Sequence, residues 1–272
     1  MVHPDTVMIQ VYSVTMTSLT ALPALTDNYI WTLTGSAGGA VIVDPGEAAP
    51  VLAAVANGLR PCAILITHHH HDHIGAVVEL TRRFDLPVYA PEDARIDMAS
   101  VRVRDGDEIR VSAAALTFQV IAVPGHTLTH VAYAGEGVVF VGDTLFSLGC
   151  GRLFEGSPAQ MLASLKRLAR LPPETLLCCA HEYTLANAAF AQAVEPGNPT
   201  LKARIDQARG QRVAGQPSLP TTLAMELATN PFLRCTEAEI QSSVRAFSSG
   251  ADTDELATFT ALRRWKDGFI AS

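Results

Sequence analysis

The first basic side chain of this 272-residue sequence is Arg60, so the residues before it include neither lysine nor arginine. Secretory signals begin with positive charge, and organelle transit peptides are rich in arginine. We therefore expect neither kind of targeting segment at this end of the sequence. The sequence also lacks an apolar run of roughly 18 residues or more, so no membrane-spanning helix is expected.

Cysteine is scarce, and its spacing gives no disulfide framework. The five cysteines are odd in number and include no Cys-x-x-Cys pair. This usage is typical of a reducing compartment, where small buried thiols take the place of disulfides. We therefore expect a soluble cytoplasmic protein, and a monomer is the working expectation for its assembly.

Positive charge is in deficit across the whole sequence. It contains 20 Lys and Arg against 27 Asp and Glu, so the formal net charge at pH 7 is 20 − 27 = −7. An acidic molecule repels the phosphates of nucleic acids. We therefore expect no nucleic-acid partner.

The sequence does contain enough apolar residues for a sizeable core, since 48% of it is hydrophobic and 17% is charged. Its length predicts about 1.8 domains. Up to residue 182, short β-branched runs alternate with Gly, Pro and Asp. From residue 183 on, helical patterns with caps replace them, such as Asn198-Pro199 and Thr236–Glu239. We predict a leader over 1–18, an α+β or α/β domain over 19–182 and a helical domain over 183–272.

The most informative segment is Thr67-His-His-His-His-Asp-His73, which follows an apolar strand and precedes an amphipathic helix. A histidine run can also be a terminal tag or a low-complexity metal sponge. This run is internal and is interrupted by Asp72, which favours a metal site. Neutral imidazole is a common metal donor, and alternate residues of an extended run point to one side. We therefore expect His69 and His71 to face away from the metal.

Three more strand-like runs end in a ligand-type residue: His126, Asp143 and His181. In a sheet that is covered on both faces, such strand ends cluster at one edge. With the histidine run, they supply enough nitrogen and oxygen donors for two divalent metals that share a carboxylate bridge. Cys150 follows Asp143 closely in the sequence, but the donor set is complete without it.

This pattern, His68-x-His70-x-Asp72-His73 followed by His126, Asp143 and His181, resembles the metallo-β-lactamase superfamily. The flanking segments are similar to those of the hydroxyacylglutathione hydrolases, the glyoxalase II family, over about residues 19–270. These segments are Leu25-Thr-Asp-Asn-Tyr-Ile-Trp31, Pro124-Gly-His-Thr127, Gly142-Asp-Thr-Leu-Phe146, Gly149-Cys-Gly-Arg152, His181-Glu-Tyr-Thr184, Pro220-Thr-Thr-Leu223, Asn230-Pro-Phe-Leu-Arg234 and Leu262-Arg-Arg-Trp-Lys-Asp267. The resemblance implies an α+β fold, an αββα sandwich followed by a small C-terminal helical domain.

The resemblance also implies which residues bind two metals. One metal would be held by His68, His70 and His126. The second would be held by Asp72, His73 and His181, and Asp143 would bridge the two. Zinc is expected, although His and carboxylate ligands also suit iron or manganese.

The family's glutathione-binding positions correspond to Arg152, Phe154, Tyr183, Arg263 and Lys266. Arg152 keeps the positive charge of the commonest eukaryotic pattern, whereas Phe154 lacks the hydroxyl of that pattern. The resemblance therefore implies that Arg152, Tyr183, Arg263 and Lys266 bind the substrate.

The implied activity is hydrolysis of S-(2-hydroxyacyl)glutathione, such as S-D-lactoylglutathione, to glutathione and D-lactate. This reaction is the second step of methylglyoxal detoxification. A hydroxide that bridges the two metals would attack the thioester carbonyl, while Asp72 and Asp143 hold the metals and orient the hydroxide. A thiolate leaves without a strong general acid, because thiol pKa values are about 8.5.

Three other functions remain as alternatives. A glutathione-persulfide dioxygenase of the same superfamily would use one iron, but the complete second ligand set and the pair Arg263 and Lys266 favour the hydrolase. A superfamily nuclease would need a basic track for phosphates, which the sequence lacks. A non-catalytic metal-binding or interaction protein would have lost ligands, and all seven are present.

Overall fold

The computed structural model describes residues 11–14, 17–248 and 254–270. Its first sheet has the strand order β1-β2-β3-β4-β5-β6-β7. The strands β1 to β4 are antiparallel to one another, and β4 to β7 are parallel. Their bounds are β1 Val11–Val14, β2 Thr17–Ala24, β3 Asn28–Thr34, β4 Ala40–Val43, β5 Pro61–Leu65, β6 Val88–Pro91 and β7 Val101–Val103.

The second sheet has the order β15-β14-β11-β10-β9-β8, and only the β11–β14 pair is parallel. A separate hairpin, β12–β13, follows β11. The bounds are β8 Glu108–Val111, β9 Leu116–Ala122, β10 Val131–Gly135, β11 Val138–Gly142, β12 Leu145–Phe146, β13 Gly149–Cys150, β14 Leu176–Cys179 and β15 Thr221–Thr222.

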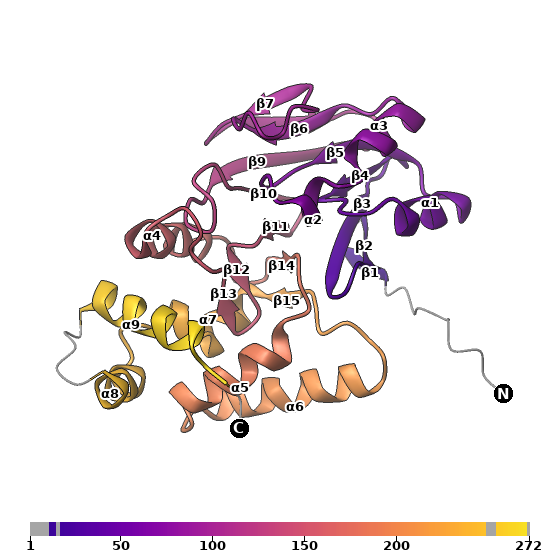
Figure 1. The fold of residues 1–272 in the computed structure, drawn as a ribbon. Coiled ribbons are helices and arrows are strands. Elements are labelled where there is room, and N and C mark those ends of the chain that lie inside the picture. The colour runs from indigo at the N-terminus through magenta and orange to yellow at the C-terminus, as the bar shows by residue number, and fades with distance from the viewer. Residues whose placement is uncertain (1–10, 15–16, 249–253, 271–272) are drawn as a thin grey trace.

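The two sheets share one apolar core, and helices cover their outer faces. In β4, Val41 and Val43 lie in the central core, while Ile42 points outward into a second cluster with Val77 and Leu80. A strand with both faces buried is a continuous apolar run, as this one is. The outer helices are α1 Ala49–Ala56, α2 His71–Ile74 and α3 Val77–Phe84 near the first sheet, and α4 Pro158–Leu168 on the side of the second (Figure 1). This is the αββα sandwich that the family resemblance implies.

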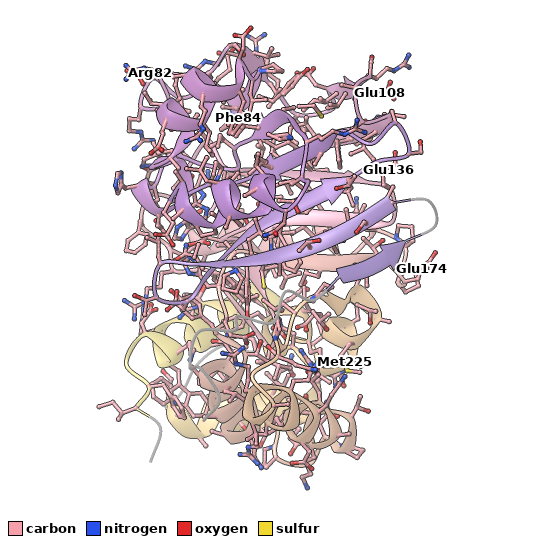
Figure 2. All side chains as sticks on the ribbon, turned by 90° about the vertical axis from the view of Figure 1, so that its right-hand side faces the viewer. Arg82, Phe84, Glu108, Glu136, Glu174 and Met225 are labelled. Atoms are coloured by element: carbon pink, nitrogen blue, oxygen red, sulfur yellow. The ribbon has the colours of Figure 1, made fainter. Side chains whose placement is uncertain are left out.

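The remaining helices gather beyond the sandwich, at the lower end of the molecule in Figure 1. They are α5 Thr184–Val194, α6 Pro199–Val213, α7 Leu223–Thr229, the 3-10 helix η1 Pro231–Leu233, α8 Ala238–Phe247 and α9 Glu255–Asp267. Figure 2 shows the same division: α3, with Arg82 and Phe84, lies at one end and Met225 of α7 lies among the helices at the other. Within the described ranges, no helix is both long and apolar enough to cross a membrane.

Two details of the predicted domain limits differ from the observed elements. The strand β1 lies inside the predicted leader, and β2 begins at Thr17, so regular structure starts before residue 19. In addition, β15 comes from the part predicted to be helical and pairs with β14 of the second sheet. The strands β1 and β15 have only four and two residues, which is too few to show a period.

Candidate metal centre

The predicted metal ligands meet at one edge of the sandwich, where strands of both sheets end. The histidine run follows β5 of the first sheet and continues into α2. From the second sheet, His126 follows β9, Asp143 directly follows β11, and His181 follows β14. The rule that strand ends cluster at a sheet edge therefore applies across both sheets here.

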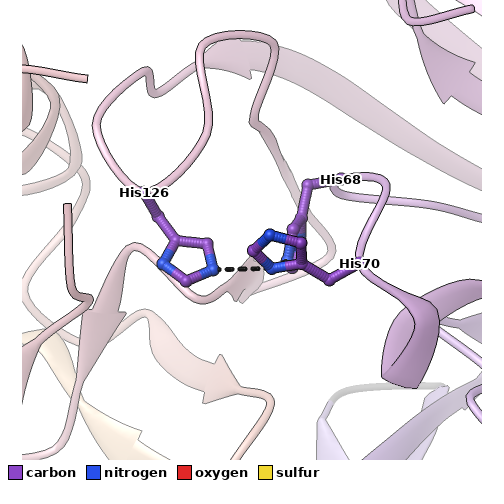
Figure 3. Close-up of side chains that lie close together, drawn as sticks. All are labelled: His68, His70 and His126. Atoms are coloured by element: carbon purple, nitrogen blue, oxygen red, sulfur yellow. Dashed lines mark hydrogen bonds between the residues drawn. The ribbon is translucent and has the colours of Figure 1, made fainter. Parts of the chain in front are cut away.

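One half of the centre is built from three histidines. The Nε2 atoms of His68 and His126 each lie 3.0 Å from Nδ1 of His70 (Figure 3). Tetrahedral zinc with Zn–N bonds of 2.0–2.1 Å separates its nitrogen ligands by about 3.3 Å. The three rings therefore stand at nearly the spacing that a shared ion needs.

The other half combines two histidines with a carboxylate. Asp72 Oδ2 lies 3.3 Å from His73 Nε2 and 3.4 Å from His181 Nε2. The rings of His73 and His181 are buried. This mixed nitrogen and oxygen set is again suited to zinc, iron or manganese.

Asp143 lies between the two halves and offers one oxygen to each. Its Oδ1 is 3.5 Å from His73 Nε2 and 3.3 Å from His181 Nε2, whereas its Oδ2 is 3.4 Å from His126 Nε2. A single carboxylate in this position can join two cations.

Unpaired buried atoms show that the centre fits metal ions. His73 Nε2 and Asp143 Oδ1 are buried and have no hydrogen-bond partner among the described residues. Such an unpaired group costs about 1–3 kcal/mol. A cation between these two atoms satisfies both, so the donor set and its geometry fit the group that the fold implies.

The electrostatics of the two halves differ. Burial and the nearby His73 ring hold the pKa of His68 well below its usual range, and burial with His126 lowers the pKa of His70 to about 4. These rings are therefore neutral, as metal ligands must be. Burial would also lower the pKa of His181, but the Asp143 carboxylate opposes it and the pKa rises to about 10. The carboxylate half thus favours positive charge.

In most of the ligand histidines, Nδ1 contacts an oxygen of a residue outside the ligand set. This contact leaves Nε2 as the nitrogen that faces the metal. The pairs are His68 with Thr67 Oγ1 at 3.0 Å, His73 with Asp44 Oδ2 at 3.0 Å, His126 with the Arg152 carbonyl at 2.9 Å, and His181 with Asp27 Oδ1 at 2.8 Å.

Sequence reasoning missed two of these outer partners, Asp44 and Asp27. Asp44 directly follows β4, so the strand-end rule that found the ligands would also have found it. Asp44 contacts Nδ1 of His73, whereas Asp72 lies beside Nε2 of the same ring. Asp44 therefore orients the His73 ring. Asp27 lies in the turn between β2 and β3, inside the segment 25–31 that carries the family resemblance, but that resemblance implied no role for it.

The other histidines lie outside the ligand set. His69 lies beside Asp93 and Glu155, at 3.4 and 3.8 Å, and His71 is exposed. His130 stacks on His68 with ring centroids 4.6 Å apart, and its Nε2 accepts a hydrogen bond from the Asp143 backbone N–H. It therefore supports two ligands from behind.

A cavity of about 470 Å³ opens beside the centre, between the sandwich and the helices. It brings together every predicted substrate-binding residue with two metal ligands. Its lining is His126, Asp143, Phe146, Cys150, Arg152, Phe154, Tyr183, Ala186, Asn187, Arg263 and Lys266. Cys150 thus lies in this cavity, outside the three donor groups that could hold a metal in the described part of the chain.

The basic side chains of this cavity differ in their hydrogen bonds to the rest of the protein. Arg263 is 5% exposed, and it donates through Nη1 to the Cys150 carbonyl and through Nη2 to Asp267, both at 2.8 Å. Lys266 donates to the Ala186 carbonyl at 3.2 Å. Burial lowers the pKa of Lys266, and nearby Arg263 and Arg152 lower it further. The cavity therefore concentrates positive charge.

Comparison with known proteins gives the class of the chain. Residues 28–181 match the family model of the metallo-beta-lactamase superfamily. The structure of ETHE1 from Myxococcus xanthus has a TM-score of 0.62 and 27% identity, and the match covers 94% of this chain and 98% of that one. The structure of TTHA1623 in a di-iron-bound form has a TM-score of 0.54 and 31% identity, covering 78% and 98%. The chain has the metallo-β-lactamase fold, and its His and Asp groups imply a dinuclear metal site.

The match of the C-terminal residues identifies the family within this superfamily. Residues 182–269 match the family model described as hydroxyacylglutathione hydrolase C-terminus. A protein of Xanthomonas campestris pv. campestris (strain B100) named hydroxyacylglutathione hydrolase is 56% identical over 255 residues, which is 93% of this chain and 99% of that protein. The chain belongs to the hydroxyacylglutathione hydrolase family. This membership favours the hydrolase over the other three functions considered from the sequence.

Proposed function

We propose that this protein hydrolyses S-(2-hydroxyacyl)glutathione thioesters, S-D-lactoylglutathione among them, to glutathione and a 2-hydroxy acid. The observation that carries this proposal is that the cationic cavity reaches His126 and Asp143 of the metal centre. Glutathione bears carboxylates, which Arg and Lys recognise by charge-assisted hydrogen bonds. A substrate whose glutathione part fills the cavity therefore brings its thioester carbonyl to the centre.

The seven residues of the centre would hold two divalent ions, zinc as first expectation. Bound ions of this kind lower the pKa of water to about 7 and polarise a carbonyl oxygen. Asp143 would serve both ions through its two oxygens. A monomeric, cytoplasmic enzyme remains part of the same proposal.

The carboxylates of the centre position the reactants and do not attack the substrate. Burial alone would raise the pKa of Asp72, but His181 and His73 hold it well below its usual range, so Asp72 stays ionised. Asn28 Nδ2 donates to Asp72 Oδ2 at 3.0 Å and fixes that oxygen. Both oxygens of Asp143 face ligand nitrogens. Neither carboxylate is free to act as a covalent nucleophile.

Hydrolysis then needs little acid catalysis from the chain. Oxygen from water adds to the acyl carbon, the C–S bond breaks, and the electron pair leaves on sulfur. Thiols have pKa values of about 8.5, so a thiolate is a stable leaving group near neutral pH. The proton released from water can then be taken up by the thiolate or by solvent.

The residues of the cavity would divide the binding of glutathione. Arg152 and Lys266 offer charged groups to a carboxylate, and Arg263 adds charge while it holds the Cys150 carbonyl. The ring of Tyr183 stacks on His181 with centroids 4.7 Å apart and lines the cavity, which supports a contact between Tyr183 and the substrate. Phe154 supplies an exposed apolar face at the mouth.

The proposal is tested by hydrolysis of S-D-lactoylglutathione with metal-replete protein, and by metal analysis of the same sample. We expect release of glutathione and D-lactate, loss of turnover after chelation, and recovery on addition of zinc. A protein that instead consumes oxygen with glutathione persulfide, and binds a single iron, would overturn the proposal.

A further inference from the structure

The turn between β2 and β3 lies against one half of the metal centre only. Asp27 Oδ1 contacts His181 Nδ1 at 2.8 Å, and Asn28 Nδ2 donates to Asp72 Oδ2 at 3.0 Å. His181 and Asp72 both belong to the mixed half of the centre. Within the described residues, no hydrogen bond or ion pair joins this turn to His68, His70 or His126.

The backbone of the turn is fixed to the strand end that carries His181. The Tyr29 N–H donates to the Ala180 carbonyl at 2.7 Å, and the Glu182 N–H donates to the Asp27 carbonyl at 2.9 Å. Asn28 pairs with His181 in an antiparallel bridge. The positions of the Asp27 and Asn28 side chains are therefore set relative to the ligand itself.

The same turn is also tied to the helical part of the molecule. The Glu182 carboxylate accepts hydrogen bonds from the Tyr29 hydroxyl at 2.9 Å and from the Ser218 N–H at 2.8 Å. Ser218 lies between α6 and β15. Glu182 thus links the strand that follows the turn to the segment before β15.

We propose that Asp27 and Asn28 are positioning residues for the second metal, the one between Asp72, His73 and His181. Asp27 holds the His181 ring so that its Nε2 faces the centre, and Asn28 holds the Asp72 oxygen at the same point. The inference rests on the metal centre of the proposed function. Outer partners of this kind are worth about ten- to a hundred-fold in metal affinity.

The test measures the two metal equivalents separately in the full-length protein. Zinc is titrated against a chromophoric chelator for the original protein, Asp27→Ala, Asn28→Ala and the control Thr26→Ala. Thr26 lies in the same turn, and Thr26 and Asp27 both line a second pocket of about 540 Å³. We expect the first equivalent to bind unchanged in every variant. The second should weaken about ten- to a hundred-fold in the Asp27 and Asn28 variants only.

Two further measurements separate positioning from a general loss of structure. Asp27→Asn keeps an oxygen acceptor for His181 and should recover most of the affinity for the second metal. The melting temperature of the metal-free protein should be the same with and without the Asp27→Ala change. Equal weakening of both equivalents, unchanged affinity in both variants, or loss of stability in the metal-free state would overturn the inference.

These outcomes are distinct from failure of the proposed function, because zinc binding is measured without substrate. If the unsubstituted protein binds two zinc ions but does not hydrolyse S-D-lactoylglutathione, the proposed reaction is contradicted and the positioning role of Asp27 still stands. Original protein that binds one zinc ion or none would overturn the positioning role directly.

Discussion

Asp143 is the residue on which both halves of the metal centre depend. Its place after β11 requires Gly142, whose φ is +48°. A Cβ on Gly142 would lie 2.3 Å from Thr67 Oγ1 and 2.8 Å from a carbon of the His130 ring. The glycine thus lets the strand end pass close to the histidine loop, so the carboxylate can reach both sides.

We predict that Asp143→Ala lowers the metal content and abolishes thioester hydrolysis, because both halves lose a ligand. Elemental analysis and a turnover assay on the same preparation measure the two effects. Asp97→Ala is a suitable control, since Asp97 is exposed. Full metal content with normal turnover in the Asp143 variant would contradict the bridging role.

Lys266 gives a second prediction at this scale, one that depends on pH. Burial, with Arg263 and Arg152 nearby, lowers the pKa of its ammonium group. The charge is present below that pKa and is lost above it, so glutathione binding should weaken at a lower pH than an ordinary lysine would allow.

The KM for S-D-lactoylglutathione should therefore rise as the pH increases through the lowered pKa of Lys266. Lys266→Arg should flatten this rise, because a guanidinium stays charged throughout. Steady-state kinetics across alkaline pH make the comparison, with exposed Lys202→Arg as the control. An identical rise in original protein and Lys266→Arg would refute the assignment.

Among the elements, the short hairpin β12–β13 forms part of the wall of the cavity beside the metal centre, and it is held by hydrogen bonds from the C-terminal helices. Asn230, at the end of α7, donates through Nδ2 to the carbonyls of Phe146 and Gly149, both at 3.0 Å. The buried carboxylate of Glu226 accepts from the Leu148 N–H at 2.8 Å. These contacts place Phe146 and Cys150 in the cavity wall.

We predict that Asn230→Ala raises the KM for S-D-lactoylglutathione and lowers the melting temperature, while metal content stays unchanged. The buried carbonyls of Phe146 and Gly149 lose their donor, and each unpaired group lowers the free energy of unfolding by about 1–3 kcal/mol. Metal analysis on the same sample is the internal control. An unchanged KM despite lower stability would show that the hairpin does not shape the cavity.

How far the sequence predicts these elements depends on their length and pattern. The run 28–34 matches β3 because it is long, apolar and bounded by turn residues. The segment after the histidines forms two helices, α2 and α3, with Gly75 between them, and a Cβ at Gly75 would lie 2.4 Å from the Gly46 carbonyl oxygen. The alanine-rich α1 shows no polar face, and the two-residue strands of the hairpin show no period, so neither was predicted.

In the candidate site, the metal ligands could be predicted from residue type and position, whereas a residue such as Asp27, which holds a ligand in place, could be found only from the folded structure. His and Asp at strand ends were visible in the sequence, and the structure brings these seven together. Asp27 contacts His181 at 2.8 Å and Glu182 contacts Tyr29 at 2.9 Å, each across more than 150 positions of the chain. No local pattern reports such a pair, so only the folded chain shows it.

At the scale of the whole molecule, the predicted metal ligands and two of the cavity's cations come from different parts of the chain. The metal ligands all lie within residues 68–181, whereas Arg263 and Lys266 come from α9. The cavity between the two parts is where they meet. Changes in α9 should therefore alter which thioester binds without altering the centre.

We predict that the double variant Arg263→Ala/Lys266→Ala strongly raises the KM for a glutathione thioester. A charge-assisted contact is worth about 1.5–3 kcal/mol, roughly ten- to a hundred-fold in affinity. Turnover of a small thioester without the peptide should change little, because its carbonyl still meets an intact centre. Exposed Lys202→Ala/Arg209→Ala is the matched control. Equal loss with both substrates would mean that the pair supports structure rather than specificity.

The strand β15 has a further consequence for the molecule. It covers the edge of β14, pairing Thr222 with Leu176 and Thr221 with Leu177. An uncovered edge strand presents free N–H and C=O groups to neighbouring chains, and a very short outer strand limits that risk. The C-terminal part of the chain, which also supplies Arg263 and Lys266 to the cavity, thus covers this edge of the second sheet against pairing with other chains. A relative that lost this part would need another way to cover the strand that leads to its metal ligand.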